Sequence, residues 1–281
     1  MSERKNRVHA EALQQALIAL RTRQFARAEH HAALILKSNR TDGAALLILA
    51  HALLGQQRAD EAVAALEKAA RRTGDPEIET LLGAALCDSR RGADGIAQLR
   101  ETAAKRPPYL PAFQELAGRL AKAGQLGEAI SVIEQGLALS PASVDLKVDL
   151  ARLCLQANDR ARARANLVAA REAAPGRLDV LTDLGSVLFL DGEYAEAADT
   201  FRNALGLRPE DPQSRANLAM CLLELGERDG AEAALRIMLR GRPQLLTRAA
   251  HALAACSHGR FFFRASTAAT FLEGDGRPAK L

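Results

Sequence analysis

Apolar and small residues recur along this chain with a period of 34 residues. A leucine column, each member followed by Gly or Ala, comprises Leu82, Leu116, Leu150, Leu184 and Leu218. An alanine column comprises Ala129, Ala163, Ala197 and Ala231, and a proline column comprises Pro107, Pro141, Pro175, Pro209 and Pro243. Each period predicts two helices of about 13 residues, with a turn between them where Gly124, Gly192, Gly226 or Asn158 adopts positive φ. Proline should end the second helix, because it cannot continue one.

The small residues are expected where the two helices cross, and larger aliphatic residues should fill the layer between hairpins. One single-residue deletion near Gly74 extends the phase towards the N-terminus. We therefore expect a tail at residues 1–8, seven tandem repeats at 9–243 and a disordered tail at 274–281. Residues 244–273 should form a degenerate eighth repeat or capping helices, the second of them at 261–272.

The columns resemble the tetratricopeptide repeat family, whose pattern is a large residue, Leu and Gly or Ala in the first helix and Ala, a bulky residue, Ala and Pro in the second. The best copy is Leu181, Leu184, Gly185, Leu188, Gly192, Ala197, Phe201, Ala204 and Pro209. The resemblance implies an all-α solenoid of helical hairpins with a right-handed superhelical twist. It also implies that partners bind along the concave wall formed by the first helices.

Composition changes this picture little. The chain has 38 basic and 34 acidic residues, a net charge of +4 and 4% aromatic residues, so neither nucleic-acid binding nor membrane attraction is indicated. It has no apolar stretch long enough for a signal or a membrane span, and its Ala- and Arg-rich composition is typical of a cytoplasmic bacterial protein. Four cysteines without paired spacing predict no metal site, and no cofactor or catalytic motif is found. We expect a protein that is not an enzyme.

The groove-facing positions of the middle repeats lie off the packed leucine stripe of each first helix. They are Asp145, Val148, Asp149, Arg152, Leu155, Asp179, Thr182, Asp183, Ser186, Phe189, Asn217 and Met220. Apolar positions at intervals, with four aspartates among them, would suit a peptide or helix that carries aliphatic anchors and some Lys or Arg. The aspartates could also be an ordinary solvated helix face.

These expectations favour a scaffold or adaptor that binds another protein or peptide in its groove. The alternative is a regulatory or targeting subunit that controls a catalytic partner. Three consecutive phenylalanines, Phe261, Phe262 and Phe263, cannot all face one neighbour on a helix. They predict either a cap on the last hydrophobic layer or a docking patch, through which the chain could also self-associate.

Overall fold

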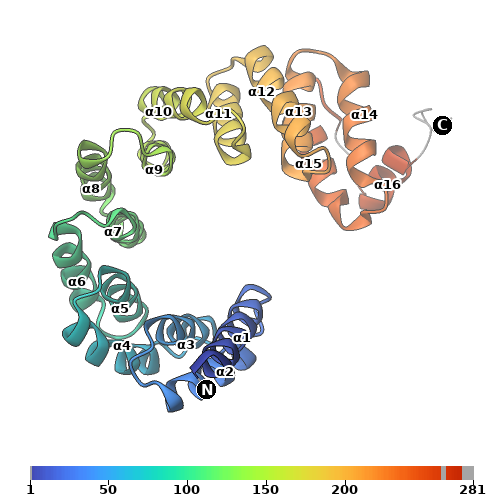
Figure 1. Ribbon diagram of the computed structural model, residues 1–281. Helices are drawn as coiled ribbons and strands as arrows, with labels where there is room; N and C mark the ends of the chain where they lie inside the picture. The colour runs from blue at the N-terminus through green and yellow to red at the C-terminus, as the bar shows by residue number, and fades with distance from the viewer. Residues whose placement is uncertain (1, 261–263, 274–281) are drawn as a thin grey trace. The chain divides into compact units, whose positions relative to one another are not determined.

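The computed structural model describes residues 2–260 and 264–273. Within these residues the chain is built from helices and turns, without β-strands, and the helices pack in successive pairs (Figure 1). The chain divides into two compact units, which are described separately: unit 1 is Met1–Pro141 and unit 2 is Ala142–Leu281. The prediction of an all-α stack of hairpins is confirmed.

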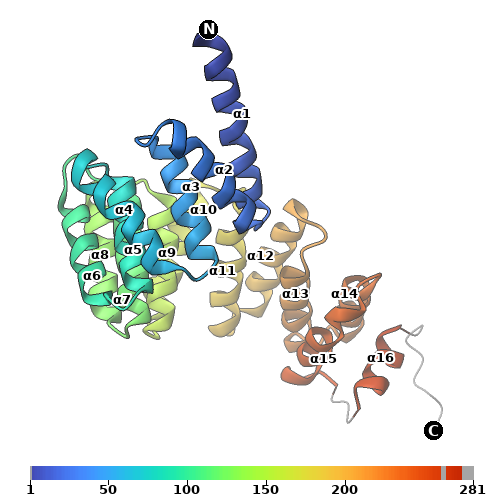
Figure 2. The same cartoon turned by 90° about the horizontal axis from the view of Figure 1, so that it is seen from below.

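Unit 1 contains four helical hairpins. Their helices are α1 (Ser2–Arg21), α2 (Phe25–Ser38), α3 (Gly43–Gly55), α4 (Ala59–Thr73), α5 (Pro76–Asp88), α6 (Gly92–Ala104), α7 (Leu110–Lys122) and α8 (Leu126–Leu139). Helix α1 extends beyond α2 at its N-terminal end (Figure 2). The segment 1–8 expected as a tail is therefore continuous with α1 from Ser2 onward.

Unit 2 contains the remaining hairpins. Their helices are α9 (Val144–Gln156), α10 (Arg160–Ala173), α11 (Leu178–Leu190), α12 (Tyr194–Leu207), α13 (Pro212–Glu224), α14 (Arg228–Leu239), α15 (Leu246–Ala255) and α16 (Ala265–Glu273), with a 3-10 turn at Pro243–Leu245 before α15. The last helix begins at Ala265, later than the segment 261–272 expected for it. Phe261, Phe262 and Phe263, like residues 274–281, lie outside the described residues.

The turn inside a hairpin needs left-handed backbone, and the predicted residues supply it. Gly124, Gly192 and Gly226 have φ of 80°, 82° and 80°, and Asn158, the non-glycine member of that column, has φ of 60°. Such angles are open to glycine and tolerated by Asn. The sequence thus correctly located these turns.

Small residues occur where the two helices of a hairpin cross. A Cβ atom added to Gly185 of α11 would lie 2.8 Å from the ring of Phe201 of α12, which is itself fully buried. In unit 1, a Cβ at Gly83 of α5 would lie 2.6 Å from the side chain of Leu99 of α6. The glycine column therefore allows a bulky residue of the second helix to reach the backbone of the first.

Ion pairs join successive hairpins within each unit. In unit 1, Arg119 of α7 binds Asp88 of α5. In unit 2, the guanidinium of Arg164 on α10 is 3.1 Å from the carboxylate of Glu196 on α12. Both pairs join residues about one repeat apart in sequence, so they follow the pitch of the stack.

Candidate functional site

The predicted groove positions lie on the first helices of three successive hairpins in unit 2. We call them the first-helix surface of unit 2: Asp145, Asp149, Arg152 and Leu155 on α9, Asp179, Thr182, Asp183, Ser186 and Phe189 on α11, and Asn217 and Met220 on α13. All of these side chains are at least partly exposed. Many recur at a spacing of 34 residues, as with Asp149, Asp183 and Asn217.

Val148 does not belong to this surface. Its side chain is only 1% exposed and packs in the core. The prediction that it faces the groove is wrong, because the hydrophobic layer around α9 covers this side of the helix. A partner cannot contact Val148 in this structure.

Arg177 links the first two helices of the surface. It precedes α11, and its guanidinium binds Asp145 of α9 and lies 2.5 Å from the carboxylate of Asp179 on α11. The bonds that Arg177 donates to Asp179 hold the pKa of that carboxyl below its usual range. Asp145 and Asp179 are therefore parts of an internal charge bridge.

A second bridge crosses the same two helices. Arg152 Nε of α9 donates a 2.7 Å hydrogen bond to Asp183 Oδ2 of α11. Burial nevertheless raises the pKa of Asp183, and the nearby Arg152 opposes this effect only in part. Asp145, Asp179 and Asp183 thus already have arginine partners from this chain, which makes the surface much less acidic than its aspartates suggest.

The two hydroxyl side chains of the surface are used locally. Thr182 Oγ1 donates to the backbone carbonyl of Asp179 at 3.0 Å, and Ser186 Oγ donates to that of Thr182 at 2.8 Å. A hydroxyl that bonds to the preceding helical turn leaves its methyl or methylene group for contact with a partner. On α13, Asn217 Oδ1 accepts a bond from Gln213 Nε2 at 2.9 Å.

Apolar side chains lie beyond the two charge bridges, near the C-terminal ends of α9 and α11, and on α13. Leu155, Phe189 and Met220 are each partly exposed. The ring of Phe189 lies 5.3 Å from that of Tyr194, which begins α12, with a tilt of 59°. This contact supports one side of the Phe189 ring while part of it remains accessible.

Sequence reasoning missed Arg177 and Tyr194. Both lie outside the first helices, in the turn before α11 and at the start of α12, so neither is among the periodic groove positions of α11. The sequence contained one signal: Arg177 is two residues before Asp179 and about one repeat after Asp145. In a stack with a repeating pitch, that spacing places a cation near both carboxylates.

Models of the tetratricopeptide repeat match residues 13–76, 120–184 and 188–256, which together are well over half of the chain. The chain belongs to the tetratricopeptide repeat family. Proteins of this family bind other proteins, so this tetratricopeptide repeat protein is, in general terms, an interaction scaffold. A comparison with curated protein sequences gave no match.

Solved structures with the same fold come from several proteins. PilF of Pseudomonas aeruginosa is 16% identical, with a TM-score of 0.57 over 71% of this chain and 91% of that one. A thermophilic tetratricopeptide repeat protein of Thermus thermophilus is 22% identical, with a TM-score of 0.54 over 64% and 99%. MamA is 16% identical, with a TM-score of 0.53 over 59% and 97%. At these identities the likeness shows the shared fold alone.

The described residues contain neither a membrane-spanning helix nor a metal-binding cluster. None of these helices is both long and apolar enough to cross a membrane. No group of three or more His, Cys, Asp or Glu side chains is placed to hold a metal ion in this part of the chain.

Proposed function

We propose that this tetratricopeptide repeat protein is a scaffold or adaptor that holds a peptide or helical segment of another protein on the first-helix surface of unit 2. The observation that carries the proposal is a set of partly exposed apolar side chains, Leu155, Phe189 and Met220, on the same surface as polar groups that are already bonded within the chain. Exposed apolar anchors beside satisfied polar groups are typical of recognition surfaces for short segments.

The charge bridges define the chemistry of such a partner. A lysine or arginine from the partner has to compete with Arg152 and Arg177 for the carboxylates of Asp183, Asp145 and Asp179. Aliphatic or aromatic anchors therefore contribute most of the affinity, while basic residues mainly influence the rate of association. We therefore expect a partner whose anchors are mainly apolar, whereas the aspartates alone suggested a basic partner.

Photo-crosslinking with the full chain tests where the partner binds. A crosslinking amino acid replaces Ser186 or Met220 on the surface and, as a control, the exposed Asn203 on the second helix α12. The expected result is one discrete protein attached at both surface positions and none at Asn203. Crosslinks from the control position alone would contradict the proposal. The identity of the attached protein also separates a structural scaffold from a subunit that regulates or targets an enzyme.

A substitution then tests the anchor. Phe189→Ala should weaken binding of the crosslinked partner by about tenfold, because it removes the largest apolar side chain of the surface. Leu207→Ala is the matched control, since Leu207 is an exposed apolar residue on α12. Titration calorimetry measures both affinities. Equal affinities for the two variants would remove the anchor role of Phe189.

A further inference from the structure

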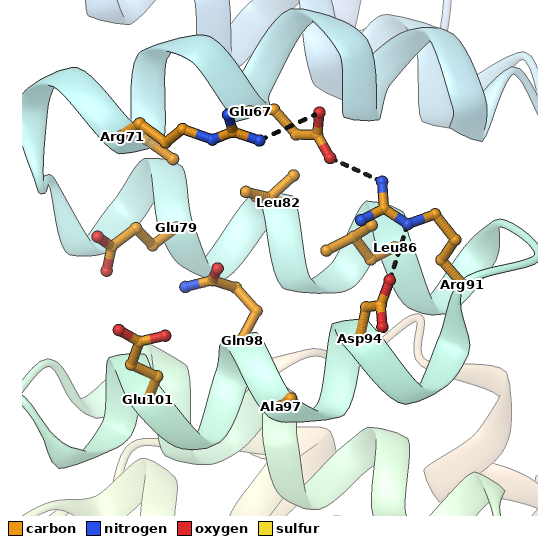
Figure 3. Close-up of a pocket in the computed structure, with 11 residues that line it drawn as sticks. Glu67, Arg71, Glu79, Leu82, Leu86, Arg91, Asp94, Ala97, Gln98 and Glu101 are labelled. Atoms are coloured by element: carbon orange, nitrogen blue, oxygen red, sulfur yellow. Dashed lines mark hydrogen bonds and ion pairs between the residues drawn. The ribbon is translucent and has the colours of Figure 1, made fainter.

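The opposite side of the hairpins, where the second helices lie, carries two grooves in unit 1. The first, of about 460 Å³, lies between α4 and α6 and has α5 as its floor (Figure 3). The second, of about 560 Å³, lies between α6 and α8 and has α7 as its floor. We call them the acidic groove and the apolar groove, respectively. Helix α6 is the wall that they share.

The two grooves are the same structural position in successive hairpins. Leu82 and Leu116 lie 34 residues apart on the two floors, and Asp94 and Glu128 lie 34 residues apart on the walls. The repeat therefore places two similar hollows side by side, and the side chains at equivalent positions give each groove its own chemistry.

The acidic groove has more carboxylates than arginines. Arg91 bonds to both Glu67 and Asp94, at 2.7 and 2.8 Å, whereas Arg71 is 81% exposed and 3.9 Å from Glu67. Glu79 and Glu101 lie at the end of the groove away from Arg91 (Figure 3).

Only one of these last two carboxylates is paired. Glu79 is 2.5 Å from Lys105 Nζ. In the part of the chain that the structure describes, Glu101 makes no ion pair or side-chain hydrogen bond. Because Leu82 lies on the floor between this end and Arg91, a cationic side chain that enters there would meet Glu101 at its head and the methyl groups of Leu82 along its stem.

The apolar groove differs at the matching positions. Phe113 replaces Glu79 on the floor, and Val132 replaces Gln98 on the wall. Its Arg100 is paired with Glu128 at 2.5 Å. Leu139, at the edge, is 42% exposed. This groove is suited to an aliphatic or aromatic side chain.

The ridge between the grooves is α6, whose exposed positions are the alanines Ala93, Ala97 and Ala104 and the charged residues Asp94, Arg100 and Glu101. A helix with its side chains is about 10–12 Å across. An extended chain advances about 3.3 Å per residue, so about three to four residues cross this ridge.

We propose that this face of unit 1 is a second docking surface, for an extended segment of another protein that places Lys or Arg in the acidic groove and an aliphatic or aromatic side chain, about three to four residues away, in the apolar groove. The proposal does not depend on the first-helix surface of unit 2, because no residue is shared. A chain with both surfaces can hold two partners at once.

The test uses the full chain and labelled peptides in a Gly/Ser background. The probe peptides carry one Arg and one Leu three or four positions apart, and the comparison peptides carry Glu in place of Arg. Fluorescence anisotropy should show saturable binding of the Arg peptides that weakens with salt, and no binding of the Glu peptides. Absence of saturable binding by the Arg peptides would overturn the proposal.

Two substitutions, each with a matched control, assign the side chains to their grooves. Glu101→Lys should raise the Kd by about tenfold, while Glu172→Lys, an exposed site on α10 with the same charge change, leaves it unchanged. Leu139→Gln should also raise the Kd, while Leu207→Gln, at the equivalent exposed position of α12, does not. Circular dichroism verifies that all four variants fold. If Glu101→Lys weakens binding but Leu139→Gln does not, simple charge attraction explains the binding, and the two-groove assignment is overturned.

A second copy of this chain is the other possible occupant. Sedimentation of the wild-type chain and of Glu101→Lys tests it. A monomer in both cases supports a different protein as the partner. Self-association that Glu101→Lys abolishes would overturn that choice.

Discussion

At the residue scale, Gly185 sets the distance between the helices of its hairpin. A Cβ there would meet the Phe201 ring at 2.8 Å, and the fully buried ring has little room to move. Gly185→Leu should therefore lower the free energy of unfolding by about 1–3 kcal/mol through overpacking. Gly206→Leu on α12 is the control, since a Cβ there meets nothing within 4 Å. Equal denaturation midpoints for the two variants would show that the helix crossing tolerates a larger residue.

Asp179 and Asp183 lie one turn apart on α11 but should titrate on opposite sides of the ordinary aspartate value of 3.8. Arg177 lowers the pKa of Asp179, whereas burial raises the pKa of Asp183. Asp179 thus contributes stability above its unfolded pKa, and this contribution is lost as pH falls through its lower folded pKa. For Asp183, any stabilisation from the raised pKa is present in acid and is lost as pH rises through the folded pKa.

Carbon-detected NMR of the side-chain carboxyls measures both pKa values directly. At pH 7, Asp179→Asn should cost up to about 1 kcal/mol, as expected for a partly exposed ion pair, and Asp183→Asn should cost less. If Asp183 instead titrates below Asp179, the assigned burial effect is wrong.

Sequence alone could place these residues on a helix face but could not determine their partners. The 34-residue phase located Asp145, Asp179 and Asp183 on the first helices, yet their pairing depends on how Arg152 and Arg177 extend across the hairpins. Val148 was misplaced for a related reason. Val148 has the same position in its repeat as the half-buried Thr182. Whether such a side chain is buried depends on the neighbouring helices that pack against it, and the residue pattern of a single helix does not reveal those contacts.

At the scale of single elements, α16 packs on α14 and α15 at the end of unit 2. Its Ala268 and Leu272 are buried, and the ring of Phe271 faces two guanidinium groups, those of Arg236 at 5.4 Å and Arg260 at 4.8 Å. Both arginines also bond to the buried carboxylate of Glu232 on α14. These contacts favour a capping role for this part of the chain.

Phe271→Ala should therefore destabilise the C-terminal hairpin by about 1–2 kcal/mol, since it removes both cation–π contacts and part of the apolar cover. Phe271→Leu, which retains much of the apolar volume, should cost less. Thermal unfolding followed by circular dichroism compares them. An Ala variant as stable as wild type would instead support a docking role for α16.

The regular elements could be predicted from the sequence, and the last hairpin only in outline. Leu, Gly and Ala columns identified the helices and turns because each position repeats many times. Near the C-terminus the columns fade, and the second helix begins at Ala265 although helix was expected from 261. This segment has no recurring residues to compare with the other repeats, so the sequence does not fix where its helix begins.

At the scale of the whole molecule, each hairpin of a repeat stack is stabilised mainly by its nearest neighbours. Gly185→Leu should therefore increase amide exchange most in α11 and α12, less in α13 and least in α1 to α4. Native-state hydrogen exchange with mass spectrometry measures this gradient. A uniform loss of protection over the chain would show that it unfolds as one cooperative body.

The ion pairs between successive hairpins also limit how the number of repeats in such a chain can change in evolution. Arg119 with Asp88, and Arg164 with Glu196, each join residues 31 or 32 positions apart. Duplication or loss of a whole 34-residue segment recreates the same spacing at the new junction, whereas a single inserted codon within a helix would rotate every later side chain by about 100°. The one shorter period is at Gly74, which follows α4 and has φ of 62°. The fold should therefore tolerate the gain or loss of whole repeats, and it should tolerate shorter insertions and deletions in the turns between helices.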